Sequence, residues 1–464
     1  MTIRVLLVAL PAAAAMNATF RLAFGSCMHQ HKPVPALAHM LSHEPHAVAF
    51  LGDNLYNDFD VCAPWMTDGC EPRRALARLA RALARNAREL AHAAIGAFAP
   101  ASAPPAMHEL ASNYEVLRAK LAPLFRFGDS GARVDARPRA YASWDDHDFG
   151  ENDAGASFAH AADAQSRFCA FWYGPSGCPH APDGVYSSHA FHTDDGTGDA
   201  RWVQLILLDT RSHRTDLLRA REAAAAADGD AVCAVEAVAA RDNDYVPFAA
   251  CDRSGGDGAP TMLGEAQWAW LEQTLRARAP DGSPFSLRLL ASPTQVLRSW
   301  NGQEAWANMP DERARLRATI AAARAERVVL LSGDVHYGEL SVEHVPAAAA
   351  AADRGAAAAA DGAAVGADAP SYPLYDLTSS GLTEARASLE PSPLRSVSNH
   401  TPALFLPRSR GSVQVWAYTH ANDRRLGEPV LANNFGLVSA QWDGAHDAGA
   451  CARVSSLRSV PPGT

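Results

Sequence analysis

The sequence is short of basic residues and of long apolar runs. Its 464 residues include 41 Lys and Arg against 51 Asp and Glu, which gives a formal net charge of -10. A protein that binds nucleic acid through the phosphates needs a basic surface, so this balance argues against a specific nucleic-acid partner. Beyond the first residues no apolar run is long enough to span a bilayer, so we expect the mature chain to be soluble.

The first residues have the pattern of a signal peptide. Arg4 supplies a short basic region, residues 5–15 form an apolar run too short to cross a membrane, and small residues around Ala15 and Ala18 offer cleavage points. The alternative is a buried strand followed by an Ala-rich linker. Taking residues 1–18 as a signal peptide, we expect a protein that is secreted, at the cell surface or in the endomembrane lumen.

Six of the eight cysteines form pairs that are close in sequence and lie in Gly-, Pro- and Asp-rich stretches. Behind a signal peptide, such pairs are read as disulfides, whereas in a reducing compartment all eight would be free thiols. Cys27 and Cys451 are left over, and they could pair with each other if Cys27 is not a ligand. The predicted disulfides are Cys62–Cys70, Cys169–Cys178 and Cys233–Cys251.

Short apolar runs alternate with helical patterns, which predicts an α/β fold with mostly parallel strands. Chemically interesting residues lie on both sides of two polar or Ala-rich insertions, at 215–260 and 347–370, so we expect one domain over residues 19–446 and a tail over 447–464. We expect strands at 20–24, 47–51, 140–144, 202–208, 286–290 and 328–331, and helices at 73–98, 107–124, 265–279 and 312–327.

Four of the expected strands run directly into compact polar clusters. Ligands of open α/β sheets bind where the strands end at their carboxyl edge, so the four clusters can converge on one site. Carboxylates that lie together repel each other unless a cation sits among them, and thiolate, phenolate and imidazole are also metal ligands. The clusters are Gly25-Ser26-Cys27, Gly52-Asp53-Asn54-Leu55-Tyr56, Asp145-Asp146-His147-Asp148 and Ser332-Gly333-Asp334-Val335-His336.

A site of this kind suits the hydrolysis of phosphate esters. The substrate is anionic and water is a weak nucleophile. A pair of metal ions lowers the pKa of a bound water, neutralises the phosphoryl oxygens and fixes in-line geometry. A nearby histidine can protonate the leaving oxygen.

The ordered set of clusters resembles the PhoD-like (alkaline phosphatase D) branch of the calcineurin-like metallophosphoesterases, over roughly residues 20–442. The resemblance implies a four-layer sandwich in which two mixed β-sheets are flanked by helices, with metals at the carboxyl ends of the strands. Further similar motifs are Leu208-Asp209-Thr210-Arg211, Met262-Leu263-Gly264-Glu265 with Gln267-Trp268, Leu377-Thr378-Ser379-Ser380-Gly381-Leu382 and Asn434-Phe435-Gly436.

The resemblance also implies roles for single residues. Asp53 should bridge the metals, Tyr56 stands where a phenolate binds ferric iron, and Cys27 should bind the same ion. Asp146 should bind the second metal; it is chosen among its neighbours by the resemblance, not by spacing. The remaining predicted metal ligands, Asp334 and His336, match the closing metal-binding motif of the superfamily.

Similar enzymes use Fe³⁺ with Ca²⁺, and other divalent metals are alternatives. The oxygen-only set Asp53, Asp146 and Asp334 suits Ca²⁺. His147 should act on the phosphate or leaving group. Arg211 ends a strand at the same edge, where it could bind phosphate or form a surface ion pair. Asn152 reads as a loop residue rather than a ligand, and the scattered histidines at 29, 31, 39, 43 and 46 receive no metal role.

The sequence therefore predicts a metal-dependent hydrolase of phosphate mono- or diesters that releases phosphate from extracellular organic phosphate. Two alternatives stay open: a protein that binds phosphate or metal without turnover, and a dinuclear enzyme of the purple-acid-phosphatase type. Cys27, and Asp334 in place of a histidine, argue against the second alternative. We expect small phosphate esters as substrates, no membrane partner, and a monomer.

Overall fold

The structure, a computed structural model, covers most of the chain between residues 20 and 458. No helix among the described residues is long and apolar enough to cross a membrane. The expected signal peptide, the helix at 73–98, the insertion at 347–370 and the pairs Cys62–Cys70 and Cys233–Cys251 lie outside the described residues. The structure describes residues 20–57, 105–124, 126–127, 133–134, 139–194, 200–220, 223, 244–248, 259–300, 302–323, 327–346, 371–385, 422, 424–426, 429–442 and 450–458.

The first sheet is mixed and has five strands. Strands β1, β2 and β5 are parallel, with β5 at one edge, and β12 and β13 extend the sheet on the other side in antiparallel pairing. The segment expected as a tail therefore contributes an edge strand. The order across the sheet is β13 (Ala450–Arg458), β12 (Asn434–Trp442), β1 (Phe20–Gly25), β2 (Ala47–Leu51) and β5 (Arg139–Ser143).

The second sheet has six strands and is also mixed. Strands β11, β9, β8 and β7 are parallel, while β10 and β6 close the two edges in antiparallel pairing. A separate small hairpin joins β3 (Arg126–Phe127) and β4 (Arg133–Val134). The order in the second sheet is β10 (Gly338–Pro346), β11 (Ser371–Ser379), β9 (Val328–Ser332), β8 (Leu287–Ser292), β7 (Ala200–Leu207) and β6 (Ser187–Asp194).

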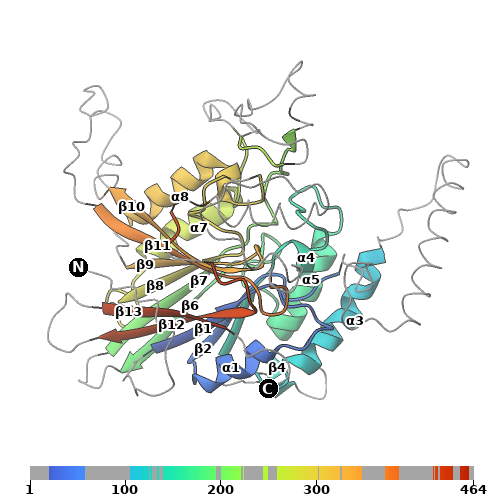
Figure 1. Ribbon diagram of the computed structural model, residues 1–464, viewed down its shortest axis with the longest axis horizontal. Helices are drawn as coiled ribbons and strands as arrows, with labels where there is room; N and C mark the ends of the chain where they lie inside the picture. Colours follow the sequence, from blue (N-terminus) through green and yellow to red (C-terminus); the bar gives the residue numbers. More distant parts are fainter. Residues whose placement is uncertain are drawn as a thin grey trace, which may run out of the picture.

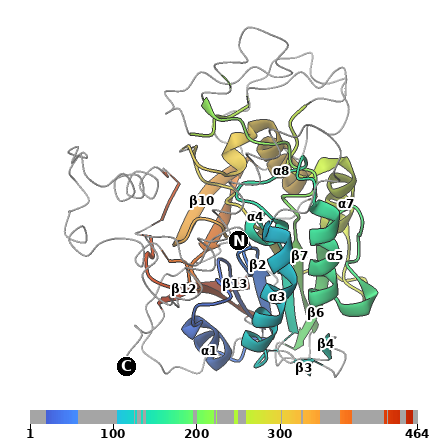
Figure 2. The same ribbon diagram turned by 90° about the vertical axis from the view of Figure 1, so that its right-hand side faces the viewer.

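Helices cover the outer faces of both sheets, so the protein has four layers (Figures 1 and 2). Helices α1 (Pro35–Ser42), α3 (Pro105–Lys120) and α5 (Ala161–Trp172) pack on the first sheet. Helices α7 (Gly264–Arg276) and α8 (Pro310–Ala322) pack on the second sheet. The predicted α/β sandwich of two mixed sheets is thus confirmed. The short helices are α4 (Asp146–Phe149), η1 (Gly174–Ser176) and η2 (Trp306–Asn308).

Strand β2 shows why its sequence is apolar at every position. Ala47, Ala49 and Leu51 point into the core between the two sheets, while Val48 and Phe50 point into the core under α1, α3 and α5. Successive side chains of a strand alternate between its faces, and here both faces are covered. The continuous apolar runs in the sequence are therefore strands buried on both sides.

Helix α8 shows how a local sequence sets an element in place. It begins with Pro310, whose fixed φ suits a first helical position, and Asp311 and Glu312 follow in the first turn. The Glu312 carboxylate accepts hydrogen bonds from Met262 N–H and Trp268 Nε1, each at 2.8 Å. These bonds tie the start of α8 to α7 and to the loop before it.

One predicted disulfide lies in the described part of the chain. Cys169, in α5, is bonded to Cys178, which follows η1. The prediction for this pair is confirmed, and Cys27 is a free, buried cysteine, as predicted. Disulfides persist in oxidising compartments, so the bond is consistent with a secreted protein.

Candidate metal centre

The four predicted clusters occupy loops that directly follow β1, β2, β5 and β9. In three of these loops, predicted ligands have left-handed backbone conformations: Cys27 at φ 60°, Asp53 at 50°, Asp334 at 74° and His336 at 63°. Residues other than glycine seldom adopt such angles, and they do so mostly at functional sites. The local backbone is therefore shaped to aim these side chains rather than to continue regular structure.

Two glycines of the clusters allow the loops to approach each other. A Cβ added to Gly52, which has φ 92°, would lie 2.4 Å from the Cβ of Asp145. A Cβ added to Gly333 would lie 2.5 Å from Ser26 Oγ. A side chain at either position would block these close approaches, which explains why glycine precedes both Asp53 and Asp334.

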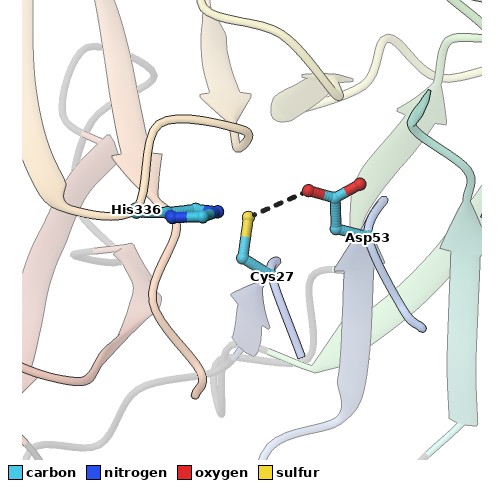
Figure 3. A group of neighbouring side chains, drawn as sticks. All are labelled: Cys27, Asp53 and His336. Atoms are coloured by element: carbon cyan, nitrogen blue, oxygen red, sulfur yellow. Dashed lines mark hydrogen bonds between the residues drawn. The ribbon is translucent and has the colours of Figure 1, made fainter. Parts of the chain in front are cut away.

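Cys27, Asp53, Tyr56 and His336 meet in one group, which we call the thiol side of the site. Cys27 Sγ is 3.3 Å from Asp53 Oδ2 and lies between that carboxylate and the His336 ring (Figure 3). Tyr56 OH is 3.3 Å from the same Asp53 oxygen and 3.1 Å from His336 Nε2. The donor atoms of Cys27, Asp53 and His336 are close enough together to hold one metal ion.

A second group, the carboxylate side, contains Asp53, Asp145, Asp146 and Asp334. Ligand oxygens of these four residues lie within 4.8 Å of one another. Asp53 belongs to both sides, which is the position that a bridging ligand requires. Its bridging role itself stays a prediction.

The electrostatics of the site favour a cation. Burial raises the pKa of Asp53, Asp145 and Asp334 well above the usual range, and neighbouring acidic groups raise it further. Burial likewise raises the pKa of Cys27 to about 12 and that of Tyr56 well above its ordinary value. A metal ion would favour the charged forms of all these groups, so the donor set fits a metal centre.

One buried atom adds to this argument. Asp145 Oδ2 has no hydrogen-bond partner among the described residues, although its side chain is fully buried. Buried carboxylate oxygens normally have a partner, and a bound cation would supply one here.

The Asp145–Asp148 segment is held by its own helix start. Asp145 caps α4 and forms a capping box with Asp148. The Asp148 carboxylate also accepts the backbone N–H of Asp53 at 3.3 Å, the backbone N–H of Asn54 at 3.2 Å and Asn54 Nδ2 at 2.6 Å. Asp148 therefore joins the loop after β5 to the loop after β2, in keeping with the expectation that some of these carboxylates are structural.

His147 lies on the boundary between the two sides. Its ring centroid is 4.3 Å from that of Tyr56, and its backbone N–H donates to Asp146 Oδ1 at 3.0 Å and to Asp53 Oδ1 at 3.4 Å. A ring nitrogen of His147 is also close enough to Asp53 and Asp146 to join them as a ligand. The geometry thus allows either a metal ligand or the predicted group acting on the substrate.

Arg211 is buried in a network of carboxylates. Its Nε donates to Asp145 Oδ1 at 2.6 Å, its Nη1 is 2.8 Å from Glu304 Oε1, and its Nη2 is 3.9 Å from Asp146 Oδ1. The side chain is 0% exposed, so the alternative of a surface ion pair is wrong. Burial raises the pKa of Asp146, but His147 and Arg211 outweigh burial and lower it below its ordinary value.

Sequence reasoning missed two acidic residues beside Asp146. Ligand oxygens of Asp153 and Glu304 lie close to one of Asp146, and Asp153 N–H donates to Asp146 Oδ2 at 2.7 Å. Glu304 comes from a loop after β8 that carries no motif, whereas Asp153 follows the α4 cluster by a few residues and has φ 59°. Asn152, which was considered, donates to the Asp153 carboxylate at 2.6 Å near the surface.

The histidines that received no metal role include one residue next to the site. His29 is buried, its ring stacks on Tyr56 at a centroid distance of 5.5 Å, and burial lowers its pKa to about 3. Its Nδ1 accepts the backbone N–H of His31 at 3.2 Å. The neutral ring supports Tyr56, and the absence of a metal role for His29 stays a prediction.

Comparison with known proteins agrees with the resemblance found in the sequence. A family model described as PhoD-like phosphatase matches residues 192–371, which include Arg211, Asp334 and His336. No curated protein matches the chain. A solved structure entitled "Structure of PhoD" is similar with 15% identity and a TM-score of 0.46, over 96% of this chain and 70% of the other.

Proposed function

Because residues 192–371 match the family model of PhoD-like phosphatases, we propose that the chain hydrolyses phosphate esters at a centre of bound metal ions. The observation that carries the proposal is the position of Asp53, which belongs at once to the thiol side and to the carboxylate side of one buried site. The proposed ligands are Cys27, Asp53, Tyr56, Asp146, Asp334 and His336.

The two sides of the site suit different cations. Tyr56, Cys27 and His336 on the thiol side, with Asp53, suit Fe³⁺, whereas the oxygen-only ligands Asp146 and Asp334, again with Asp53, suit Ca²⁺. We propose this iron and calcium pair, with other divalent metals as substitutes at the carboxylate side.

The metals would supply an activated water and neutralise the phosphoryl oxygens. The residues of the chain hold the geometry. Asp53 keeps the two ligand sets in register, and His147, between Tyr56 and Asp146, donates a proton to the leaving oxygen. Arg211 is buried and pairs with Asp145 and Glu304, so we propose that it orients the carboxylate side instead of contacting phosphate itself.

The setting of the reaction is also part of the proposal. The Cys169–Cys178 disulfide supports secretion, and with it a role in releasing phosphate from extracellular organic phosphate. We propose that the enzyme acts as a monomer on small phosphate esters, monoesters or diesters, without nucleic acid or membrane as a specific partner.

The test uses the purified full chain and two chromogenic substrates. Release of nitrophenol from nitrophenyl phosphate and from bis(nitrophenyl) phosphate should require metals, stop after chelation and return when Fe³⁺ and Ca²⁺ are restored. The ratio of the two rates gives the preference between monoesters and diesters. Asp53→Asn is the inactive control.

The other outcomes of the same test separate the alternatives. Metal and phosphate binding without turnover of either substrate would favour a non-catalytic binding protein. Full activity with iron and zinc and without calcium would favour a dinuclear enzyme of the purple-acid-phosphatase type.

A further inference from the structure

Ser380 lies where the two sheets meet above the metal centre. Strand β11 of the second sheet ends at Ser379, and Ser380 then forms an isolated parallel bridge with Ser26, which follows β1 of the first sheet. Ser26 N–H donates to Ser379 O at 3.1 Å, and Leu382 N–H donates to Ser26 O at 3.1 Å. These backbone bonds fix Ser380 beside Cys27, and its side chain is fully buried.

The hydroxyl of Ser380 contacts two predicted ligands at once. The backbone N–H of His336 donates to Ser380 Oγ at 2.8 Å, and Ser380 Oγ is 3.0 Å from Cys27 Sγ. A backbone N–H can only donate, so the serine oxygen is the acceptor in the first contact. The single hydrogen of the hydroxyl is then left for the sulfur of Cys27.

We propose that Ser380 is a positioning residue of the metal centre, which donates a hydrogen bond to the Cys27 thiolate and at the same time holds the His336 loop. The inference rests on the proposed metal-binding function. Cys27 and His336 both have left-handed backbones, which persist only where the surroundings hold them, and Ser380 touches both. A hydrogen bond to a charged sulfur is stronger than one between neutral groups, so the contact matters most when the thiolate binds metal.

The neighbouring serine provides a matched control. Ser379 is as buried as Ser380, but its Oγ donates to Asn434 Oδ1 at 2.8 Å and not to a predicted ligand. Its backbone contact with Ser26 does not depend on its side chain. Ser379→Ala therefore removes one buried hydroxyl hydrogen bond from the same strand end without touching the metal ligands.

The experiment uses Co²⁺ as a probe on the full chain after chelation. Co²⁺ bound to a thiolate gives a charge-transfer band, and its affinity follows from competition with a chromophoric chelator. Partners outside the ligand set typically change metal affinity about 10- to 100-fold, and we expect Ser380→Ala to weaken Co²⁺ binding by that factor and to shift the band. Ser380→Thr, which keeps the hydroxyl, should remain within a few-fold of wild type.

Unfolding midpoints of the metal-free variants separate positioning from general stability. We expect Ser379→Ala and Ser380→Ala to lower the midpoint to a similar degree, with only Ser380→Ala affecting the Co²⁺ band. If Ser380→Ala does not fold, Ser380→Gly removes the same hydroxyl and should also weaken binding.

The outcomes distinguish this inference from the proposed function. Ser380 variants that bind Co²⁺ with the wild-type affinity and band would overturn the inference alone, as would an equal loss in Ser379→Ala. A wild-type protein that binds no Co²⁺ at Cys27 would overturn the proposed metal centre, and this inference with it.

Discussion

The thiol side and the carboxylate side of the metal centre differ in what neutralises their acidic groups. On the thiol side, Cys27 and Tyr56 can be protonated, and they hydrogen-bond to Asp53, to His336 and to neighbouring serines. The carboxylate side instead has charged partners within the protein. Arg211 pairs with Asp145 and Glu304, and Arg214 also pairs with Glu304.

The difference fits the proposal of two metal positions joined at Asp53. The thiol side can exist as a neutral cluster and would need to lose protons before it could bind a metal as thiolate and phenolate. The carboxylate side has more acidic groups than the two arginines can neutralise, and burial raises the pKa of Asp145 and Asp334 well above the usual range. Metal binding should therefore release protons at both sides, from a thiol and a phenol at the thiol side and from carboxyl groups at the carboxylate side.

Asp53→Asn should have the largest effect, because it acts on both sides. We expect it to weaken both metals and to reduce kcat/KM by more than the roughly 10²- to 10³-fold that loss of one transition-state donor causes. The metal-free variant should nonetheless unfold at a higher temperature than metal-free wild type, since the pKa of Asp53 is raised by burial and by acidic neighbours. Metal analysis, kinetics and thermal unfolding check these points; a variant that keeps both metals would show that Asp53 does not bridge.

Cys27→Ser and Asp334→Asn should separate the two sides. Cys27→Ser should lose iron and keep calcium, while Asp334→Asn should do the reverse. Loss of a ligand should weaken binding of the affected metal by at least roughly 10- to 100-fold. This is the effect typical of residues that only hydrogen-bond to the ligands.

Metal content by elemental analysis and the visible spectrum measure this separation. Tyr56 bound to ferric iron should give a phenolate-to-iron charge-transfer band, which Asp334→Asn should retain. A colourless, iron-free and fully active wild type would contradict the ferric assignment while leaving the hydrolase proposal intact.

His147→Ala tests the residue on the boundary between the sides. As a general acid it should contribute about 10²- to 10⁴-fold for poor leaving groups such as alkyl alcohols, and much less for nitrophenolate, with both metals retained. The measurement is kcat/KM for both substrate types together with bound metal. Loss of metal would instead make His147 a ligand, and an equal loss for both substrates would indicate phosphate binding without proton donation.

Two opposing contributions should set the pH dependence of the metal-free protein: buried carboxyl groups whose pKa is raised, and the buried imidazole of His29, whose lowered pKa makes stability rise with pH up to about 6.5. Burial raises the pKa of Asp148 to about 7, and burial with Glu304 and Asp146 raises that of Asp153 to about 7. These values exceed the unfolded value of about 3.9, so the folded state holds more protons on these groups, and their contribution to the free energy of unfolding should fall as pH rises from about 4 to 7. The fall should be at most about 1.4 kcal/mol per pH unit for each group.

Cys27 on the thiol side should not add to this pH dependence, because its pKa of about 12 lies far above the range from about pH 4 to 7. Urea unfolding of chelated protein at pH 5 and pH 7 measures the difference, and added Ca²⁺ should shrink it. An Asp148→Asn variant whose stability changes between pH 5 and pH 7 as much as that of wild type would show that Asp148 is already ionised in the folded protein.

Much of the fold and of the thiol side could be predicted from the sequence because their signals are local. Strands such as β2 are apolar at every position since both faces are covered, and Cys27, Asp53 and His336 each follow such a strand within a few residues. Parallel strands bring their carboxyl ends to one edge, so the meeting of these loops follows from topology.

The partners of the carboxylate side could not be predicted in the same way. Glu304 stands in a loop with no motif. On the thiol side, Ser380 likewise lies beside Cys27 only because β11 places it there. Arg211 was recognised at the sheet edge, but its burial against Asp145 depends on how the two sheets pack together. Residues whose roles depend on tertiary contacts have no characteristic spacing or motif in the sequence.

Tyr245→Phe should have the smallest effect and should be confined to the carboxylate side. Tyr245 lies within the expected insertion at 215–260, and its OH donates to Asp153 Oδ2 at 2.6 Å, while Asp153 N–H donates to Asp146 Oδ2. Removing the hydroxyl should lower the free energy of unfolding by about 0.5–1.5 kcal/mol and weaken calcium binding several-fold, because Asp153 loses a partner that helps hold its left-handed backbone. Calcium titration and the iron charge-transfer band measured on the same variant decide the matter: a weaker calcium site with an unchanged band would show that the insertion supports one side only, and a changed band would show that the two sides are coupled through more than Asp53.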